Sequence, residues 1–199
     1  DAIVRLEGID KRFGDVQANQ GIDLEIRAGR IKALLGENGA GKSTLMSILA
    51  GRIKPDAGRI HIAGAARTYL TPREAIGAGI GMVYQHFTLI EALNVAENVC
   101  LGQSAGFWHD PRGDRRQVAR LAETVGLEID PAAPVARLSM GERQRVEILK
   151  LLQRQSRVLI FDEPTSVLTP PEIEQLFRAL RRMAAQGKAI VFISHKLGE

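Results

Sequence analysis

The chain is poor in cysteine and in long apolar segments. Its single cysteine, Cys100, has no partner within the chain, so an internal disulfide is excluded. We expect this residue to be a small buried side chain in a reducing compartment. The longest apolar runs, at residues 157–161 and 189–194, have the length of strands and are far too short to cross a bilayer. The chain also opens without a basic and then apolar leader, so nothing in the sequence suggests secretion.

Aromatic residues make up only 5% of the 199 residues, and the net charge of +4 is modest. Arginines gather at residues 112–120 and again at 178–182, but no aromatic residues are interleaved with them as platforms for stacked bases. Such runs are usually the solvated faces of helices. We therefore expect no nucleic acid partner.

What the sequence does contain is an alternation of strand and helix patterns. Apolar runs and period-two alternation predict strands at residues 22–26, 31–35, 59–62, 79–84, 157–161 and 189–194, with 31–35 as a buried strand. Capping residues, first-turn prolines and apolar spacing predict helices at 42–50 and 139–155, and others that start at Thr71, Asn94, Asp110 and Thr169. Because helix patterns dominate between residues 87 and 156, the sequence predicts an α/β core with a mainly helical insertion.

One glycine-rich segment matches the phosphate-loop pattern G-x-x-x-x-G-K-[ST]. It runs Gly36-Glu-Asn-Gly-Ala-Gly-Lys-Ser43, with Thr44 behind it, between a predicted strand and a predicted helix. Glycines let the backbone wrap a phosphate with its N–H groups inward, and the positive end of the following helix faces the same anion. In this pattern Lys42 reaches the outer phosphates and the Ser43 hydroxyl ligates Mg²⁺. The segment predicts a nucleotide site, but it does not by itself choose among kinases, GTPases and other ATPases.

Candidate polar sites follow four of the predicted strands, and they begin at Gly36, Gln85, the pair Asp162–Glu163, and His195. Because the carboxyl ends of parallel strands meet at one edge of a sheet, we expect these residues to lie together. We expect Asp162 to hold Mg²⁺ and Glu163 to orient or deprotonate the attacking water. The alternative is an acidic strand-to-loop turn finished by a proline.

His195 and Gln85 are interpreted as functional residues because they are expected at the same edge of the sheet as these neighbours. We expect His195 to sense the γ-phosphate, although a lone histidine is more often a satisfied structural residue. Gln85 is expected to bind Mg²⁺ and water at the hinge into the helical insertion.

The segment Leu138-Ser-Met-Gly-Glu-Arg-Gln144 decides among the nucleotide-binding families. Together with the phosphate loop, Gln85, Asp162–Glu163 and His195, it resembles the nucleotide-binding domain of ABC transporters in order and spacing over essentially the whole chain. The resemblance implies a P-loop NTPase core of mainly parallel sheet, with an antiparallel β subdomain and an inserted α-helical subdomain. It divides the chain into an ATP-binding core at 1–86 and 157–199 and a helical subdomain at 87–156, with the C-terminal part of the domain missing.

The resemblance also assigns the site. It implies that ATP contacts Phe13, Gly36, Asn38, Gly39, Ala40, Gly41, Lys42, Ser43 and Thr44. It further implies Mg²⁺ on Ser43, Gln85 and Asp162, and catalysis by Glu163, His195 and Gln85. In the family two domains meet head to tail, so Ser139 and Gly141 would close over the ATP of the other domain.

Phe13 and Ser139 each have a second interpretation. Phe13 is the only aromatic residue before the phosphate loop, and its ring face can stack on adenine where the family usually has tyrosine. Packing in the core is the alternative. Ser139 and Glu142 form a capping-box pattern, and the free N–H groups of the helix they open make a natural anion site. A simple helix cap is the alternative, and it is compatible with phosphate contact across an interface.

Two departures from the family pattern stand out. Met140 and Glu142 occupy positions where glycine and glutamine are commonest, and the charge of Glu142 puts ribose contact in doubt unless it is used in the cap. Thr169 ends the loop after the Asp162–Glu163 pair, where most members have aspartate, so communication between two ATP sites could differ.

A narrower resemblance rests on Met82-Val-Tyr-Gln-His-Phe87, Val95-Ala-Glu-Asn98, the segment 162–170 and the segment 194–197. These look like the ATPases of simple-sugar and nucleoside importers, whose polypeptides usually carry two such domains, this chain being similar to the N-terminal one. Thr169 also fits that subfamily. The resemblance implies a Mg²⁺-dependent ATPase at the cytoplasmic face of the membrane. Its partners would be transmembrane permease subunits, a solute-binding protein and a second nucleotide-binding domain, in tandem or as a homodimer.

Three other functions share parts of this pattern. DNA-repair and chromosome-structure ATPases carry long heptad coiled coils between the phosphate loop and the signature, and the segment here has no sustained heptads. A soluble translation-type ABC ATPase would need a charged linker and a second cassette. An ATP-binding regulator without turnover is disfavoured by Glu163 and His195.

Overall fold

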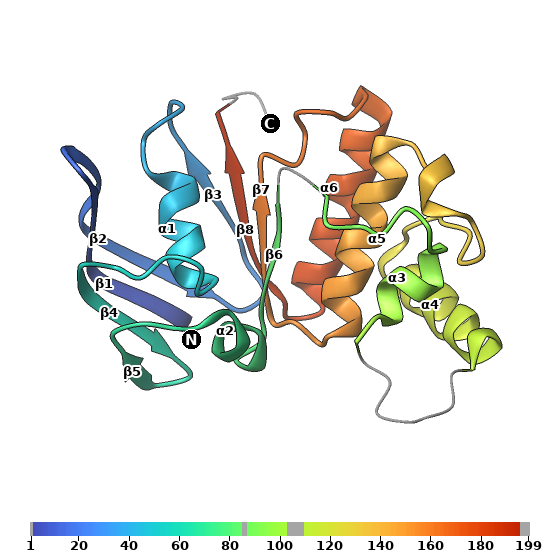
Figure 1. Ribbon diagram of the computed structural model, residues 1–199, viewed down its shortest axis with the longest axis horizontal. Coiled ribbons are helices and arrows are strands. Elements are labelled where there is room, and N and C mark those ends of the chain that lie inside the picture. Colours follow the sequence, from blue (N-terminus) through green and yellow to red (C-terminus); the bar gives the residue numbers. More distant parts are fainter. Residues whose placement is uncertain (1, 85–86, 103–109, 196–199) are drawn as a thin grey trace.

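Two four-stranded sheets form the β-structure of the computed structural model, which describes residues 2–84, 87–102 and 110–195 (Figure 1). The antiparallel sheet contains β1 (Ala2–Phe13), β2 (Val16–Arg27), β4 (Ala57–Ile62) and β5 (Ala65–Arg67), in the order β2-β1-β4-β5. The parallel sheet contains β3 (Ile31–Leu35), β6 (Ile80–Val83), β7 (Val158–Asp162) and β8 (Ala189–Ser194), in the order β3-β8-β7-β6.

Helices cover the sheets and fill the segment between β6 and β7. They are α1 (Lys42–Leu49), α2 (Pro72–Gly77), α3 (Val95–Cys100), α4 (Pro111–Val125), a 3₁₀ turn at Val135–Arg137, α5 (Met140–Gln153) and α6 (Pro170–Ala185). Within the described ranges, no helix combines the length and apolar character that a bilayer span requires. The predicted fold class, a parallel and an antiparallel sheet with inserted helices, is confirmed, while the proposed subdomain boundaries stay a prediction.

Local sequence explains where several helices begin. Thr71, Asn94 and Ser139 each accept a hydrogen bond from the backbone N–H three residues later, at 3.3, 2.9 and 3.2 Å. In each case a glutamate at that third position accepts a hydrogen bond from the backbone N–H of the capping residue. These capping boxes satisfy N–H groups that have no partner within the helix, so they fix the starts of α2, α3 and α5.

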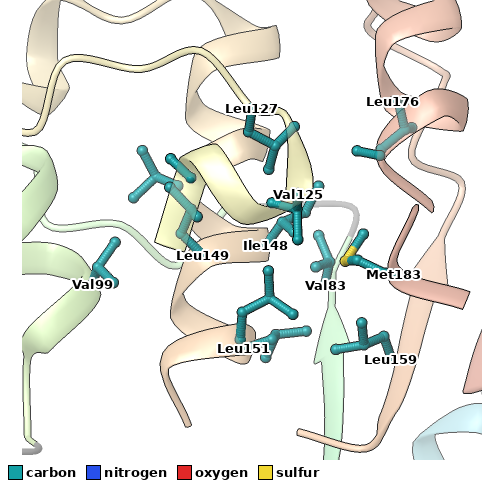
Figure 2. Packing of buried hydrophobic residues seen from close by; sticks show 14 of the residues in the cluster. Val83, Val99, Val125, Leu127, Ile148, Leu149, Leu151, Leu159, Leu176 and Met183 are labelled. Carbon is teal, nitrogen blue, oxygen red and sulfur yellow. The ribbon is translucent and has the colours of Figure 1, made fainter. Parts of the chain in front are cut away.

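The parallel sheet is buried on both faces, as the apolar run of β7 shows. Val158 and Ile160 pack toward α1 and the antiparallel sheet, whereas Leu159 and Phe161 pack toward α5 and α6. Figure 2 shows the core on the α5 and α6 side of the sheet, here called the second core, in which Ile148 and Leu151 of α5 lie near Val83 and Leu159. Leu149 lies on the side of α5 that faces Val99 of α3. The strand direction and the two cores together hold the carboxyl ends of the parallel strands at one rim.

The core on the other face of the parallel sheet, here called the first core, joins the two sheets through α1. Figure 1 shows α1 between the antiparallel and the parallel sheet, with α3 to α5 at the opposite end of the molecule. Met46 and Ile48 of this helix are fully buried with Leu6 of β1 and Ile60 of β4. The helix that follows the phosphate loop is therefore packed on two sides, which fixes the position of the loop.

Strand β3 corrects one prediction. The sequence predicted a buried strand at residues 31–35, and the structure has the strand but leaves Ile31 37% and Leu35 52% exposed. The reason is its place in the sheet, because β3 lies at the edge and pairs only with β8 among the described strands. Sequence patterns also missed β1 and β5.

Cys100 lies at the end of α3 and is buried, as predicted. Burial raises the pKa of its thiol to about 11, and the nearby carboxylate of Asp114 adds to the shift. The thiol therefore stays protonated at neutral pH, and it behaves as a small packing group rather than a nucleophile.

Replacement of a core leucine tests the importance of the second core. Leu149 is fully buried, so Leu149→Ala should leave a cavity and lower the free energy of unfolding by about 2–5 kcal/mol. Leu101→Ala is the matched control because Leu101 is 48% exposed, and its effect should stay within about 0.5 kcal/mol. Chemical denaturation of both variants gives the comparison, and equal losses would contradict the packing described here.

Candidate nucleotide site

The phosphate loop lies between the end of β3 and the start of α1, as the sequence predicted. Gly41, the residue before α1, has a left-handed backbone with φ of 80°. A Cβ atom at this position would overlap the carbonyl oxygen of Ala18 in β2. Glycine is therefore required at Gly41 both by the backbone conformation and by the close approach of β2.

Lys42 folds back over its own loop. Its Nζ donates to the carbonyl oxygens of Gly36 at 2.7 Å and Glu37 at 2.8 Å. The ammonium group thus bonds to the loop backbone, and its charge lies beside the hollow that the glycines enclose. It is placed to exchange carbonyl oxygens for phosphate oxygens.

Ser43 and Asp162 meet at the rim although 119 residues separate them in the chain. The Ser43 hydroxyl donates to Asp162 Oδ1 at 3.0 Å. Burial raises the pKa of the Asp162 carboxyl and the charge of Glu163 adds to this, while the hydrogen bond from Ser43 and the charge of Lys42 act in the opposite direction. A hydroxyl and a carboxylate side by side offer oxygen ligands to a divalent cation.

Glu163 and His195 form a second polar pair beside the first. His195 Nδ1 lies 3.1 Å from Glu163 Oε1, and both residues directly follow neighbouring strands, β7 and β8. Glu163 has a left-handed backbone with φ of 47°, and its N–H donates to the carbonyl of Ile193 at 3.1 Å. The turn that ends β7 is thus fixed to β8, which aims the carboxylate along the rim.

An open pocket surrounds the phosphate loop. It is lined by Phe13, Val16, Ala18, Asn38, Gly39, Ala40, Gly41, Lys42, Ser43, Thr44 and Glu163. Phe13 lies exposed at the end of β1, and Lys11 Nζ lies 5.3 Å from its ring centroid. The ring therefore faces this pocket rather than the hydrophobic core, so the structure does not support the alternative of core packing.

Ser139 and Gly141 do not line this pocket. They start α5, where the Ser139 N–H donates to Glu142 Oε2 at 2.8 Å. Glu142 is thus used in the helix cap, the condition under which its charge matters less for a nucleotide. A Cβ atom at Gly141 would meet the end of the Glu172 side chain at the start of α6, so a larger residue there would require that side chain to move.

Some site residues fall outside these observations. Gln85 lies outside the described residues, so its expected role at the hinge stays a prediction. In contrast, Asn19 and Ala18 of β2 contact the phosphate loop and were not predicted from the sequence. Asn19 is one of several polar residues in β2, so nothing in the sequence distinguished it from the others.

The donor set at the rim suits a cation that takes few protein ligands. Across residues 2–84, 87–102 and 110–195, no three His, Cys, Asp or Glu side chains cluster as a metal site. The oxygen pair Ser43–Asp162 instead matches the way Mg²⁺ is bound beside substrate phosphates, by one or two protein groups with water and phosphate completing the shell. The residues present therefore fit Mg²⁺.

Comparison with curated proteins gives similar chains among importers. The chain is 45% identical over its full length to the nucleoside import ATP-binding protein NupA of Lactococcus lactis subsp. cremoris (strain MG1363). It is 48% identical over its full length to the ribose import ATP-binding protein RbsA 1 of Burkholderia thailandensis. In both comparisons the chain spans 40% of the length of the relative.

Solved structures and the family match agree with this result. A nucleotide-free ATP-binding cassette from an ABC transporter superposes with a TM-score of 0.85 at 25% identity, covering 99% of this chain and 83% of that one. A dimeric cassette in a post-hydrolysis state, bound to ADP and Pi, gives a TM-score of 0.82 at 27% identity, covering 98% and 88%. Residues 19–166 match the ABC transporter family. The chain therefore belongs to the ABC transporter family.

Proposed function

We propose that this chain binds and hydrolyses ATP as part of the energising subunit of an importer for a nucleoside or simple sugar. The observation that carries the proposal is the rim itself, where the Ser43–Asp162 and Glu163–His195 pairs adjoin a complete phosphate loop. The cargo class rests on the relatives, which are nucleoside and ribose import ATP-binding proteins.

ATP would enter with its phosphates over the loop and its base at Phe13. The backbone N–H groups at the start of α1 would bind the phosphates, supported by the positive end of the helix. Lys42 would leave the carbonyls of Gly36 and Glu37 and pair with the outer phosphates. The exposed ring of Phe13 would stack on adenine.

Hydrolysis would depend mainly on positioning and on charge stabilisation. Ser43 and Asp162, with Gln85, would hold Mg²⁺, which when bound shields the charge of the phosphates. Glu163 would orient the attacking water and take its proton, and a proton on Nδ1 of His195 would hold the Glu163 carboxylate by a hydrogen bond. The edge of the His195 ring that carries Nε2 would contact the γ-phosphate.

A second cassette would complete the site. Ser139 and Gly141 lie away from the pocket of their own chain. The Ser139 hydroxyl and the N–H of Gly141, which has no partner within the helix, would be available to the nucleotide of another cassette. The relatives are about two and a half times as long as the matched segment, which supports a tandem arrangement with this chain as the N-terminal cassette. A homodimer is the other arrangement.

The remaining partners follow from the importer proposal. They are transmembrane permease subunits, which would hold the protein at the cytoplasmic face of the membrane, and a solute-binding protein that delivers cargo. The alternative, a soluble ABC ATPase acting on nucleic acid or ribosomes, is disfavoured because the similar curated proteins are import ATP-binding proteins.

Replacement of Glu163 tests hydrolysis. Glu163→Gln keeps the shape of the side chain but removes its capacity to accept a proton, so ATP should still bind while turnover falls by about 10²-fold or more. Steady-state ATP hydrolysis by the intact transporter is the measurement. Glu174→Gln on the exposed face of α6 is the control and should keep the parental rate. Parental turnover in Glu163→Gln would refute the assignment of Glu163.

Replacement of Phe13 tests adenine stacking. Phe13→Ala removes the ring face, and the KM for ATP should rise by about tenfold with little change in kcat. Phe13→Tyr keeps a ring and should retain most of the affinity. Steady-state kinetics over a range of ATP concentrations separates KM from kcat. If alanine leaves KM where it was, the ring does not contact the base.

A further inference from the structure

Asn19 is a buried polar residue of β2 that contacts the phosphate loop. Its side chain is 5% exposed, and its Nδ2 donates to the carbonyl oxygen of Gly41 at 3.1 Å. The same carbonyl accepts the first helical hydrogen bond of α1, from Leu45 N–H at 2.9 Å. Two donors therefore fix the orientation of the Gly41 carbonyl.

The other end of the Asn19 amide has no partner. Among the described residues, Oδ1 of Asn19 is buried and makes no hydrogen bond. A buried acceptor without a donor destabilises the folded state, and leucine has the same branched arrangement of heavy atoms without that penalty. Stability alone therefore does not account for asparagine at this position.

Asn98 shows what a structural asparagine looks like in the same molecule. It is equally buried, but it accepts from Ile90 N–H at 2.8 Å and donates to the carbonyls of Ile90 and Asn94 at 3.0 and 3.1 Å. Its amide is thus used at both ends to support the start of α3. Asn19 differs because its one bond goes to the residue that leads into the nucleotide helix.

Control of the Gly41 carbonyl has a geometric consequence. The carbonyl of Gly41 and the N–H of Lys42 belong to one planar trans peptide, so they point in opposite directions. When Asn19 holds the carbonyl toward β2, the Lys42 N–H is held away from β2. That N–H is among the first N–H groups of α1, which have no partner within the helix.

β2 also pairs with the strand that carries Phe13, since Phe13 lies opposite Val16 and Lys11 opposite Asn19. The hairpin that would bind the base and the loop that would bind the phosphates thus meet at Gly41, through the Ala18 carbonyl and the Asn19 amide.

We propose that Asn19 is a positioning residue that sets the orientation of the Gly41–Lys42 peptide, and with it the grip of the phosphate loop on ATP. The proposal rests on the proposed function, because it assumes that ATP binds at this loop. The unpartnered Oδ1 is then a cost to folding that is offset by tighter nucleotide binding.

The test compares Asn19→Leu with Asn98→Leu in the 199-residue chain. Asn19→Leu should weaken ATP binding by about three- to tenfold, the effect of one lost hydrogen bond, while thermal unfolding without nucleotide stays at or above the parental temperature. Asn98→Leu should do the reverse, with a lower unfolding temperature and parental ATP affinity. Isothermal titration with Mg²⁺ and ATP gives the affinities, and Asn19→Ala is measured alongside in case leucine does not pack.

The outcomes separate the two proposals. ATP affinity at the parental value in folded Asn19→Leu or Asn19→Ala would overturn the positioning role while leaving the proposed function intact. A large loss of stability in both Asn19 variants would also overturn it, because the amide would then be structural. Failure of the parental chain to bind ATP would remove the proposed function and this inference together. In the intact transporter, the substitution should raise KM with kcat unchanged.

Discussion

The parallel register of β3, β8 and β7 is the constraint on which the rest of the molecule depends. Leu35 lies opposite Ser194, and Asp162 opposite Ile193, so the residues that follow all three strands emerge at one height. A shift of one residue would carry Asp162 away from the Ser43 hydroxyl and turn its side chain to the other face. Apolar packing on both faces of the sheet therefore sets the distances between the polar groups at the rim.

Much of this arrangement could be predicted because short segments of the sequence determine it. The capping boxes at Thr71, Asn94 and Ser139 and the loop from Gly36 are local, and their geometry follows from a few neighbouring residues. The exposed flank of β3 could not be predicted, because its exposure depends on which strands lie beside it. β1 was missed because a register shift between Leu6 and Ile9 breaks its period-two pattern. The position of Asn19 at the phosphate loop could not be predicted either, because it depends on the tertiary contact with Gly41.

Buried polar side chains of α5 bind the helical part of the molecule to loops at the rim. Gln144 donates to the carbonyl of Pro164 at 3.0 Å, just after the Asp162–Glu163 pair. One turn later, Glu147 accepts hydrogen bonds from the N–H and the hydroxyl of Thr88. Both contacts include a backbone group of the loop, which remains when the side chain of the loop residue is replaced. The helix that starts at Ser139 is thereby joined to the loop after β7 and to the segment after β6.

The Lys42 ammonium group is hydrogen-bonded within its own phosphate loop. Because this group already bonds two carbonyl oxygens, nucleotide binding as proposed above would exchange these bonds for new ones to phosphate. The observed affinity must then be the difference between two sets of charge-assisted bonds. Under the proposed function, the same two carbonyl oxygens would compete with the product for the Lys42 ammonium group and would thereby favour product release.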